Sequence, residues 1–451
     1  MGSGGNTLRL DSSKVEARES ARNGHFRRLM GNSYGVMNHI LSLNAGSSSL
    51  KFSLYLMDCG KETLVFAGSV TNIGAATAKF SVQQHKVVEG EQKAIAGNPT
   101  KCTAANMTDA CKVVFDWIKE QGEDYVPVDV VGHRVVHGGP HIHAPQCVNQ
   151  ELVEVLRALS MYAPEHLPPV LEAIAFAKQA YPRVPHIACF DTSFHRTMSS
   201  VASSYALPEA YRKHGVQKFG FHGLSYQYLM SALVCEMGAE AVKTQKIVLA
   251  HLGQGASLAA VHNCLCVDTT MGFSPCGGFP MATRLGDVDP EVVLFLQEHE
   301  GAADLKDILN KNCGLVAFCD KGGDFRELEN AATKHDAAAC FAIDYFVYHL
   351  VKHLSSLVGA LGGLDCLVFS AGIGENSTLV RQRVCVGLAY LGVVLDDEQN
   401  CAPGACARVI SAASSRVSVR VIPTCEEVVI ARGSLDAAKS VLVPSQQKEA
   451  V

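Results

Sequence analysis

One short segment of the sequence concentrates groups that bind oxyanions. Asn44-Ala-Gly-Ser-Ser-Ser-Leu-Lys51 offers an amide, an ammonium group and several hydroxyls, among them those of Ser47 and Ser49. Gly46 lets a ligand approach the backbone closely, and short hydroxyls donate readily to phosphate oxygens. A serine-rich turn is often no more than a turn, so the segment predicts phosphate binding only in combination with other residues.

Charged side chains that suit phosphoryl transfer occur elsewhere in the chain. Arg134 lies within a β-branched run, where a buried guanidinium is costly without an anion, and Arg284 lies in a loop rich in glycine and proline. Asp191 and Glu426 each follow an expected strand, and His222 stands between an aromatic residue and a glycine. Arginines, a histidine and hard oxygen ligands for Mg²⁺ are what phosphoryl transfer needs, because it depends on positioning and on neutralising phosphate oxygens.

Each of these residues also has an ordinary structural explanation. An aspartate at the end of a strand, such as Asp191, is often a turn or cap residue. His222 beside Phe221 is also compatible with a core histidine whose hydrogen bonds are satisfied. The two histidines near the first arginine, His133 and His137, are expected to be structural. The occurrence of all the charged motifs in one chain is what favours the catalytic interpretation.

The sequence predicts alternating strands, loops and helices that would position these groups. Strands are expected at residues 39–43, 52–57, 128–136, 186–190, 246–250, 258–262, 364–369 and 416–422, and helices at 108–121, 151–159, 168–180 and 428–438. A linker rich in Pro, Gly and Tyr is expected at residues 205–221. The segment His251-Leu-Gly-Gln-Gly-Ala-Ser257 is flanked by strands, as the serine-rich segment is, which indicates a duplicated architecture. Neither loop has the signature of a P-loop, and no dinucleotide-binding fingerprint is present.

The composition bounds the class of protein. The chain has 451 residues, of which 48% are apolar and 18% charged, and its formal net charge is −5. This length suits two or three domains with substantial cores, and the charge gives no reason to expect binding to nucleic acid or to a membrane surface. No apolar run reaches the roughly 18 residues that a membrane-spanning helix needs. The 17 scattered cysteines lack a preceding export signal and are expected to be buried, reduced thiols.

Residues 1–37 differ from the rest of the chain. They are polar and rich in arginine, and they contain acidic residues but no apolar stretch. A transit peptide would be poorer in acidic residues, so a disordered or leader extension is expected. A cytoplasmic location follows as the expectation, with organellar targeting by this extension as the alternative.

Several motifs occur in the order typical of one enzyme family. They are Asn-Ala-Gly-Ser-Ser-Ser-Leu-Lys, Gly-His-Arg-Val-Val-His-Gly-Gly, Phe-Asp-Thr-Ser-Phe-His, Gly-Phe-His-Gly, Met-Gly-Phe-Ser-Pro, Ala-Gly-Ile-Gly-Glu-Asn-Ser and Ile-Pro-Thr-x-Glu-Glu. Together they resemble the acetokinase family of short-chain carboxylate kinases, over roughly residues 38–440. The resemblance implies a duplicated actin-like (ribonuclease H-like) α/β fold. Its two domains, around a cleft, would be residues 38–194 plus 427–451 and residues 195–426.

The resemblance also implies an activity. The reaction would be the reversible, Mg²⁺-dependent transfer of the ATP γ-phosphoryl group to acetate, giving acetyl phosphate and ADP, with Mn²⁺ as an alternative metal. The enzyme would be a homodimer, with no nucleic-acid or membrane partner. A carboxylate is already a nucleophile and needs no general base, so residues that hold two anions together would do most of the work.

The roles of individual residues follow from the same resemblance. The implied catalytic residues are Arg134, Asp191, His222 and Arg284, and the implied metal ligands are Asn44, Asp191 and Glu426. The acyl pocket would be lined by Arg134, Val136, Glu165, Phe221 and Pro275. The nucleotide phosphates would lie near Asn44, Ser47, Ser49, Lys51, His251, Gly253, Gln254 and Gly255. The adenosine would lie near Asp324, Phe325, Arg326, Gly372, Ile373, Gly374 and Asn376.

Some positions depart from the usual family pattern. Gln254 and Cys425 each replace an asparagine, and Tyr226 replaces a histidine. Glu165 takes a normally apolar position in the acyl pocket, where a carboxylate would repel acetate unless it were protonated or turned away. Propionate or butyrate therefore stays open as the acceptor, and pyrophosphate as the donor. A non-catalytic actin-like nucleotide-binding protein is a more distant alternative, since it has no need for both arginines.

Overall fold

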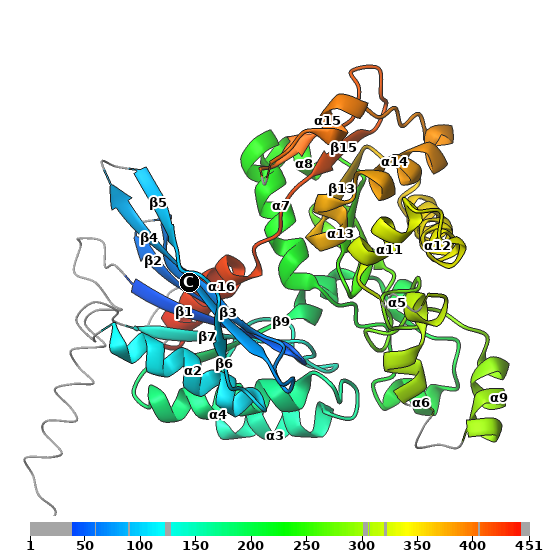
Figure 1. Ribbon diagram of the computed structural model, residues 1–451. Helices are drawn as coiled ribbons and strands as arrows, with labels where there is room; N and C mark the ends of the chain where they lie inside the picture. The colour runs from blue at the N-terminus through cyan, green and yellow to red at the C-terminus, as the bar shows by residue number, and fades with distance from the viewer. Residues whose placement is uncertain are drawn as a thin grey trace, which may run out of the picture.

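The computed structural model describes residues 38–58, 60–88, 91–121, 128–300, 305, 307–319, 323–404 and 406–442. The predicted leader extension, residues 1–37, lies outside the described residues, as do residues 443–451 of the predicted first domain. The described chain forms two α/β lobes, each with its own sheet and hydrophobic core (Figure 1).

The first lobe is built on a nine-stranded sheet. Its central strands, in spatial order, are β3 (Lys61–Thr71), β2 (Ser49–Asp58), β1 (Asn38–Ala45), β7 (Val130–Val135) and β9 (His186–Phe190). β1, β7 and β9 are parallel neighbours, whereas β2 and β3 pair antiparallel. The carboxyl ends of β1, β7 and β9 therefore lie at one edge of this sheet.

Helices cover both faces of the first sheet. The helices on one face are α2 (Met107–Glu120), α3 (Gln150–Leu159) and α4 (Leu167–Ala180), and the helix on the other is α16 (Glu426–Leu442) (Figure 1). Successive side chains of a strand point to opposite faces. Leu41 and Leu43 of β1 accordingly join the core under α2 and α4, while Ile40, directly before Leu41, packs with α16.

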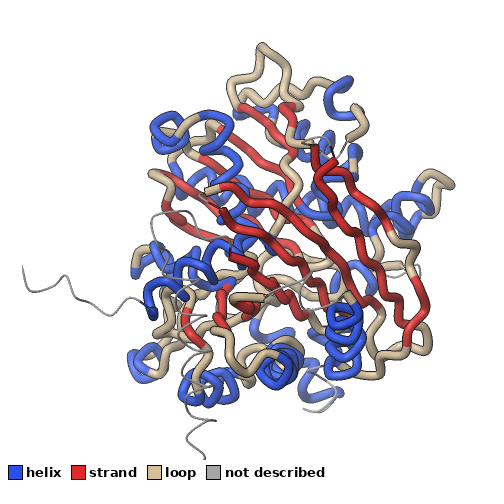
Figure 2. Tube along the Cα trace, turned by 90° about the vertical axis from the view of Figure 1, so that its left-hand side faces the viewer, coloured by secondary structure: helices blue, strands red, loops and turns tan. Residues whose placement is uncertain are grey.

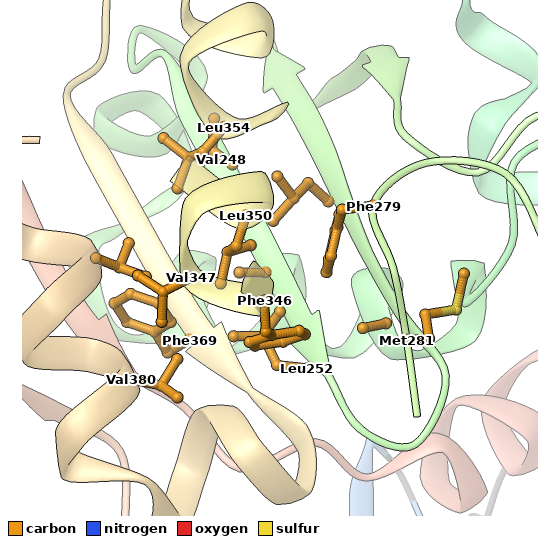
Figure 3. Packing of buried hydrophobic residues seen from close by; sticks show 14 of the residues in the cluster. Val248, Leu252, Phe279, Met281, Phe346, Val347, Leu350, Leu354, Phe369 and Val380 are labelled. Atoms are coloured by element: carbon orange, nitrogen blue, oxygen red, sulfur yellow. The ribbon is translucent and has the colours of Figure 1, made fainter. Parts of the chain in front are cut away.

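The second lobe is built on a six-stranded sheet. Its strands, in spatial order, are β12 (Leu265–Thr269), β11 (Ala256–His262), β10 (Ile247–Leu252), β13 (Cys366–Ser370), β15 (Ser418–Val421) and β14 (Arg408–Val409). The long helix α12 (Ala337–Leu361) packs on one face and α7 (Gly223–Met237) on the other. Figure 3 shows how Phe346 and Leu350 of α12 pack against Leu252 and Phe369 of this sheet.

The two sheets repeat one design. The orders β3-β2-β1-β7-β9 and β12-β11-β10-β13-β15 correspond strand for strand, with the same pattern of parallel and antiparallel pairs. Figure 2 shows strands running side by side through the molecule with helices on both sides. The predicted duplicated architecture is confirmed. The serine-rich loop between β1 and β2 is thus the counterpart of the glycine loop between β10 and β11.

The remaining elements are short or peripheral. The other strands are β4 (Ala78–Val88), β5 (Glu91–Ala96), β6 (Thr100–Cys102) and β8 (Gln146–Cys147). The other helical segments are η1 (Asp191–Thr197), α5 (Ser200–Ser203), α6 (Glu209–Lys213), α8 (Ala239–Lys243), α9 (Pro290–Glu300), η2 (Ile308–Asn312), η3 (Gly314–Ala317), α11 (Phe325–Ala332), α13 (Ala371–Asn376), α14 (Thr378–Gly387), η4 (Ala389–Leu391) and α15 (Asp397–Cys401). None of the helices in the described ranges combines the length and apolarity that crossing a bilayer requires.

The structure differs from the sequence-based expectations in several places. α7 and α12 are not among the predicted helices, and β3 and β4 are not among the predicted strands. α12 carries apolar residues on both its buried and its exposed sides, for example Phe346 and Phe341, which obscures a helical period. The described cysteines are free thiols, but Cys235, Cys264, Cys401 and Cys406 are exposed, so the expected burial is wrong for them.

Candidate active site

The candidate site forms where strand ends from both sheets converge. Asn44 lies near the carboxyl end of β1, Arg134 near that of β7, and Asp191 directly after β9. His251 lies near the end of β10 in the second sheet, and Glu426 begins α16 just after β15. Ligands of open α/β sheets bind outside the carboxyl ends of parallel strands, so this edge is where a substrate is expected.

Arg134 is the centre of a charged cluster in the first lobe. Its Nη2 donates to Asp191 Oδ2 at 2.6 Å, and its Nε lies 3.2 Å from both oxygens of the same carboxylate. Its Nη1 donates to Asn44 Oδ1 at 3.1 Å, and Glu426 Oε2 lies 3.7 Å from Nε. The Asn44 amide in turn donates to Glu426 at 2.9 Å and to Glu427 at 3.3 Å. The cluster therefore links β1, β7, β9 and α16.

Burial and neighbouring charges set the ionisation of this cluster. Burial raises the pKa of Asp191, and the nearby Glu426 adds to that rise while Arg134 opposes it. Burial acts against the charge of Glu426 too, but Arg134, His251 and Lys51 hold its pKa below the usual value. Burial also disfavours the charge of Arg134, yet Asp191 and Glu426 raise its pKa above the usual value. One guanidinium thus serves two buried carboxyl groups.

The chemistry of this cluster fits a Mg²⁺ ion. Mg²⁺ takes one or two carboxylates together with waters, and Asp191 and Glu426 are two carboxyl groups that share a single positive partner. The side-chain amide of Asn44 adds an oxygen ligand beside them. Among the described residues, no three histidine, cysteine, aspartate or glutamate side chains form a metal-binding group. An ion held here would therefore keep water among its ligands.

Two stacked histidines form the second lobe's side of the site. The rings of His222 and His251 lie 4.1 Å apart at an interplanar angle of 18°. His222 caps α7 with left-handed backbone angles (φ 59°, ψ 23°), a conformation uncommon for a residue with a side chain. Burial, then His251, Arg134 and Arg284, lower the pKa of His222 well below its usual value. Burial lowers the pKa of His251 to about 4, so both rings are neutral at pH 7.

Arg284 reaches the same place without a carboxylate partner among the described residues. Its Nη1 donates to the Pro275 carbonyl at 3.2 Å, and its Nη2 lies 3.3 Å from His166 Nε2. Burial lowers the pKa of Arg284, and repulsion from Arg134 acts in the same direction. Arg284 and Arg134 both lower the pKa of His166, which burial brings to about 3. Two partly buried guanidiniums that repel each other and face neutral imidazoles form a site for an anion.

Gly255 leaves the space in front of Arg284 and His222 open. A Cβ at position 255 would lie 3.0 Å from Arg284 Nη1 and 3.4 Å from His222 Nε2. The turn is closed by a hydrogen bond from Gly253 N to the Gly255 carbonyl at 3.1 Å. The glycine loop therefore provides a hollow whose walls are one guanidinium and one imidazole. Gln254 lies at the tip of the same turn.

The serine-rich loop of the first lobe is more open. Ser47 and Lys51 are exposed, and Ser49 is partly exposed. The Gly46 N–H donates to the Ser49 carbonyl at 2.8 Å, which closes the turn. The Lys51 ammonium lies near enough to His251 and Glu426 to lower the pKa of both. The loop thus adds an exposed positive charge and solvent-accessible hydroxyls to the edge of the site.

The predicted acyl pocket is apolar, with one exception. Val136, Phe221 and Pro275 are buried. The Glu165 side chain is 41% exposed, and its carboxylate lies 3.9 Å from Lys311 Nζ. The carboxylate is thus turned toward a lysine of the other lobe, the second of the two outcomes considered above, and the place of Glu165 in the acyl pocket stays a prediction.

The segments expected near adenosine lie at the ends of second-lobe elements. Gly372, Ile373, Gly374 and Asn376 belong to the short helix α13, which directly follows β13. Asp324 caps α11 and pairs with Arg326 at 2.7 Å on the surface. The Phe325 ring is different. It packs in the core, 5.2 Å from the Phe346 ring, so it is not free to stack on a base.

Sequence reasoning missed Glu375 and Thr424 as organising residues. One Glu375 carboxylate oxygen accepts from Ala371 N at 2.7 Å and from Thr424 N at 3.3 Å. Thr424 Oγ1 lies 2.8 Å from Ser225 Oγ, which in turn lies 2.8 Å from His251 Nδ1. Ala371 has a left-handed backbone (φ 65°). The sequence did contain a signal for Glu375. Its carboxylate comes directly after Gly-Ile-Gly, a segment that follows a buried strand.

Comparisons with known proteins agree on one family. The model of the acetokinase family matches residues 39–432. Acetate kinases from Rhodopseudomonas palustris and Clostridium kluyveri are each 39% identical, over 397 and 399 residues, covering 87% of this chain and 96% of their own lengths. The solved structure of Porphyromonas gingivalis acetate kinase superimposes with a TM-score of 0.75 and 32% identity, over 89% of this chain and 99% of that one. A propionate kinase from Francisella tularensis gives a TM-score of 0.77 and 31% identity, over 89% and 100%.

Proposed function

Because the chain belongs to the acetokinase family and is a kinase that phosphorylates a carboxylate with ATP as co-substrate, we propose that its acceptor is acetate and its products are acetyl phosphate and ADP. The fold is the duplicated actin-like α/β fold that the resemblance implied. The observation that carries the proposal is the convergence of two guanidiniums, Arg134 and Arg284, from opposite lobes on one buried site. The relatives named acetate kinase support the choice of acetate.

In the proposed mechanism the arginines bring two anions together. The carboxylate of the acceptor attacks the γ-phosphorus directly, and the bond to the β-phosphate oxygen breaks as ADP leaves. Arg284 and Arg134 offset the repulsion between acceptor and phosphoryl oxygens and hold them in line. His222, being neutral, donates a hydrogen bond to a phosphoryl oxygen. Closure of the lobes would exclude water, which otherwise would take the phosphoryl group.

The nucleotide is proposed to lie along the second sheet. Its phosphates would contact the residues Asn44, Ser47, Ser49, Lys51, His251, Gly253, Gln254 and Gly255, and its adenosine the residues Asp324, Arg326, Gly372, Ile373, Gly374 and Asn376. Asp191, Glu426 and Asn44 would hold Mg²⁺, or Mn²⁺ in its place. When bound, the metal would neutralise charge on the phosphate oxygens.

The test is hydroxamate formation from acetate, ATP and hydroxylamine. The wild-type chain should give acetyl hydroxamate, because hydroxylamine traps acetyl phosphate. Absence of product would overturn the proposal and favour a non-catalytic actin-like protein. The same assay with pyrophosphate in place of ATP distinguishes the donors, since activity with pyrophosphate alone would overturn the choice of ATP.

Propionate is the second candidate acceptor. The Francisella tularensis neighbour is a propionate kinase, and the apolar walls formed by Val136, Phe221 and Pro275 suit one more methylene. An additional methylene in an apolar pocket changes discrimination by about 10- to 200-fold. Comparing kcat/KM for acetate, propionate and butyrate decides between them. A clear preference for butyrate would contradict the acetate proposal.

The homodimer is proposed to form through the second lobe. α12, α14 and η4 expose large apolar side chains: Phe341, Tyr348, Val386 and Tyr390. Exposed apolar side chains clustered on one surface are typical of subunit interfaces. Light scattering of the wild type and of Tyr348→Glu should give dimer and monomer masses, and a monomeric wild type would contradict the proposal. The domain limits 38–194 plus 427–451 and 195–426, and the cytoplasmic location, stay predictions.

A further inference from the structure

A chain of hydrogen bonds runs from α7 through β11 to His222. Tyr226 lies one helical turn after His222 on α7, and its hydroxyl is 2.5 Å from Ser257 Oγ. Ser257 Oγ is in turn 2.9 Å from His222 Nδ1. Tyr226 and Ser257 are fully buried, with no exposed surface. Water therefore does not compete for these hydroxyls, and each proton in the chain must be accepted by a protein group.

The direction of donation follows from counting protons. Burial raises the pKa of the Tyr226 phenol, so the phenol keeps its proton. The phenol must therefore donate to Ser257 Oγ, because no other acceptor contacts it among the described residues.

The Ser257 proton then has one destination. With Tyr226 donating to Oγ, the serine's own proton points to His222 Nδ1. In the opposite arrangement Nδ1–H would donate to Ser257, and the serine proton would lack an acceptor in the described part of the chain. A buried hydroxyl without an acceptor pays its full desolvation cost, so the first arrangement is favoured. The remaining proton of the neutral imidazole is therefore on Nε2.

We propose that Tyr226 and Ser257 are positioning residues that fix His222 as a neutral hydrogen-bond donor through Nε2, aimed at the hollow above Gly255. The hollow is where a phosphoryl group would pass, because Nε2 and Arg284 Nη1 both border the position of a Cβ at residue 255. This inference rests on the proposed phosphoryl transfer. A donor fixed beforehand needs no reorganisation when charge moves onto the equatorial oxygens.

The neutral state of His222 explains why its tautomer needs to be fixed. Arg134 and Arg284 already supply two positive charges, and both act against a third on His222. A free neutral imidazole populates both tautomers. In the tautomer with its proton on Nδ1, Nε2 would present a lone pair to an anion. The chain through Ser257 excludes that tautomer. The neighbouring His251 also has a hydroxyl at its Nδ1, that of Ser225, at 2.8 Å.

The direct test reads the tautomer without any substrate. Nitrogen chemical shifts of ¹⁵N-histidine-labelled full-length protein distinguish a protonated Nδ1 from a protonated Nε2. His222, assigned by its loss in His222→Gln, should carry its proton on Nε2 in the wild type. In Ser257→Ala, which has no hydroxyl at Nδ1, the neutral ring should populate both tautomers. In Tyr226→Phe the serine proton still has Nδ1 as its acceptor, so the Nε2 tautomer should persist. Tyr228→Phe on the same helix is the matched control and should keep the wild-type spectrum. A proton on Nδ1 in the wild type, or an unchanged Ser257→Ala spectrum, would overturn the proposal.

Kinetics separate positioning from a merely structural role. Ser257→Ala should lower kcat by about tenfold, as loss of a supporting hydrogen-bond partner commonly does, with KM for acetate nearly unchanged. In a His222→Gln background the same substitution should add no further loss, since it acts through His222. If the substitution instead lowered kcat by the same factor in the wild-type and His222→Gln backgrounds, and also lowered Tm, its role would be structural and the proposal would be overturned. If the wild type proves inactive, the proposed function fails while the tautomer measurement still decides the hydrogen-bond chain.

Discussion

The two lobes bring one arginine each to the site and hold it in different ways. Arg134 of the first lobe is fixed by Asp191, Asn44 and Glu426. Arg284 of the second lobe contacts a carbonyl, a thioether and an imidazole, with no carboxylate partner in the described ranges. The first arginine is thus part of the framework, whereas the second is free to take an anion. The same reaction needs both, but their removal should affect the protein differently.

The difference extends to the strand ends. In the first sheet β7 and β9 end in charged groups, Arg134 and Asp191. Their counterparts β13 and β15 end in Ser370 and in the neutral segment that leads to Thr424. The second lobe supplies neutral donors and glycines instead. The strand ends of the two lobes therefore differ, because those of the first lobe carry the carboxyl groups and their arginine, whereas those of the second offer uncharged groups to phosphate.

The largest expected effect separates the two arginines. Arg134→Ala and Arg284→Ala should each lower kcat in the hydroxamate assay by about 1,000-fold, as loss of a main donor to transition-state charge does. Arg134→Ala should also lower the free energy of unfolding by about 3–5 kcal/mol, because it leaves two buried carboxyl groups without their cation. Arg284→Ala should change it by less than about 1 kcal/mol. Urea unfolding of both variants measures this.

Lysine variants provide the control for charge. Arg134→Lys keeps the positive charge but not the paired donors to Asp191, so it should recover stability more than activity. Equal destabilisation by Arg134→Ala and Arg284→Ala would show that the lobes do not differ in the way described.

The next effect compares the glycines of the two equivalent hairpin loops. Gly255→Ala should lower kcat/KM by about 100-fold, because its Cβ would crowd Arg284 Nη1 and occupy the space in front of His222. Gly46→Ala is the matched variant in the first lobe. Its Cβ would meet only Ser49, at 3.3 Å from the movable Oγ, so the loss should stay within about twofold. Similar losses for both would mean that the two loops surround phosphate equally closely.

Much of the sheet framework was predictable from the sequence. Buried, β-branched runs that end in glycine or serine define strands clearly, and the predicted strand 186–190 coincides with β9. The duplication could be inferred because two such runs each lead through a glycine-containing turn into another strand. α7 and α12 could not be predicted, because neither helix shows a single apolar stripe. In α12, for example, Leu350 is buried while Tyr348 is exposed.

The site was predictable as a list of residues but not as a set of contacts. The motifs named Arg134 and Asp191, yet the hydrogen bonds between them span 57 positions of the chain. The link from Glu375 to Thr424 spans 49 positions and depends on how β13 and β15 lie side by side. The orientation of Glu165 depends on Lys311 of the other lobe. Such pairings are decided by tertiary packing, which no local pattern records.

Acid should weaken both lobes together. Burial lowers the pKa of His186, in the first sheet, and of His195, which contacts Cys266 of the second, to about 4 from the ordinary 6.5. Since the folded state keeps these rings neutral, their contribution to stability is present above about pH 6.5 and is lost as pH falls toward 4. Each of these two histidines should lower the free energy of unfolding by about 1.4 kcal/mol for every pH unit of acidification in that range.

Two probes can follow the lobes separately in this experiment. The single tryptophan, Trp117, packs on Phe66 in the first lobe, so its fluorescence reports on that lobe, whereas far-UV circular dichroism reports on both. Urea midpoints from the two probes should fall in parallel between pH 7 and pH 5. If the urea midpoint from tryptophan fluorescence did not change with pH while the midpoint from circular dichroism fell, the two lobes would not respond equally to acid.

The smallest expected effect concerns the contact between the lobes at the acyl pocket. Glu165→Gln should change kcat/KM for acetate by less than about twofold, because the carboxylate faces Lys311 at 3.9 Å and a half-exposed ion pair contributes little. Lys311→Gln is the matched variant at the other end of the pair and should have the same small effect. A large gain in acetate turnover from Glu165→Gln alone would mean that the carboxylate enters the pocket when the lobes close. The second lobe's lysine would then be what keeps the first lobe's acid away from the substrate.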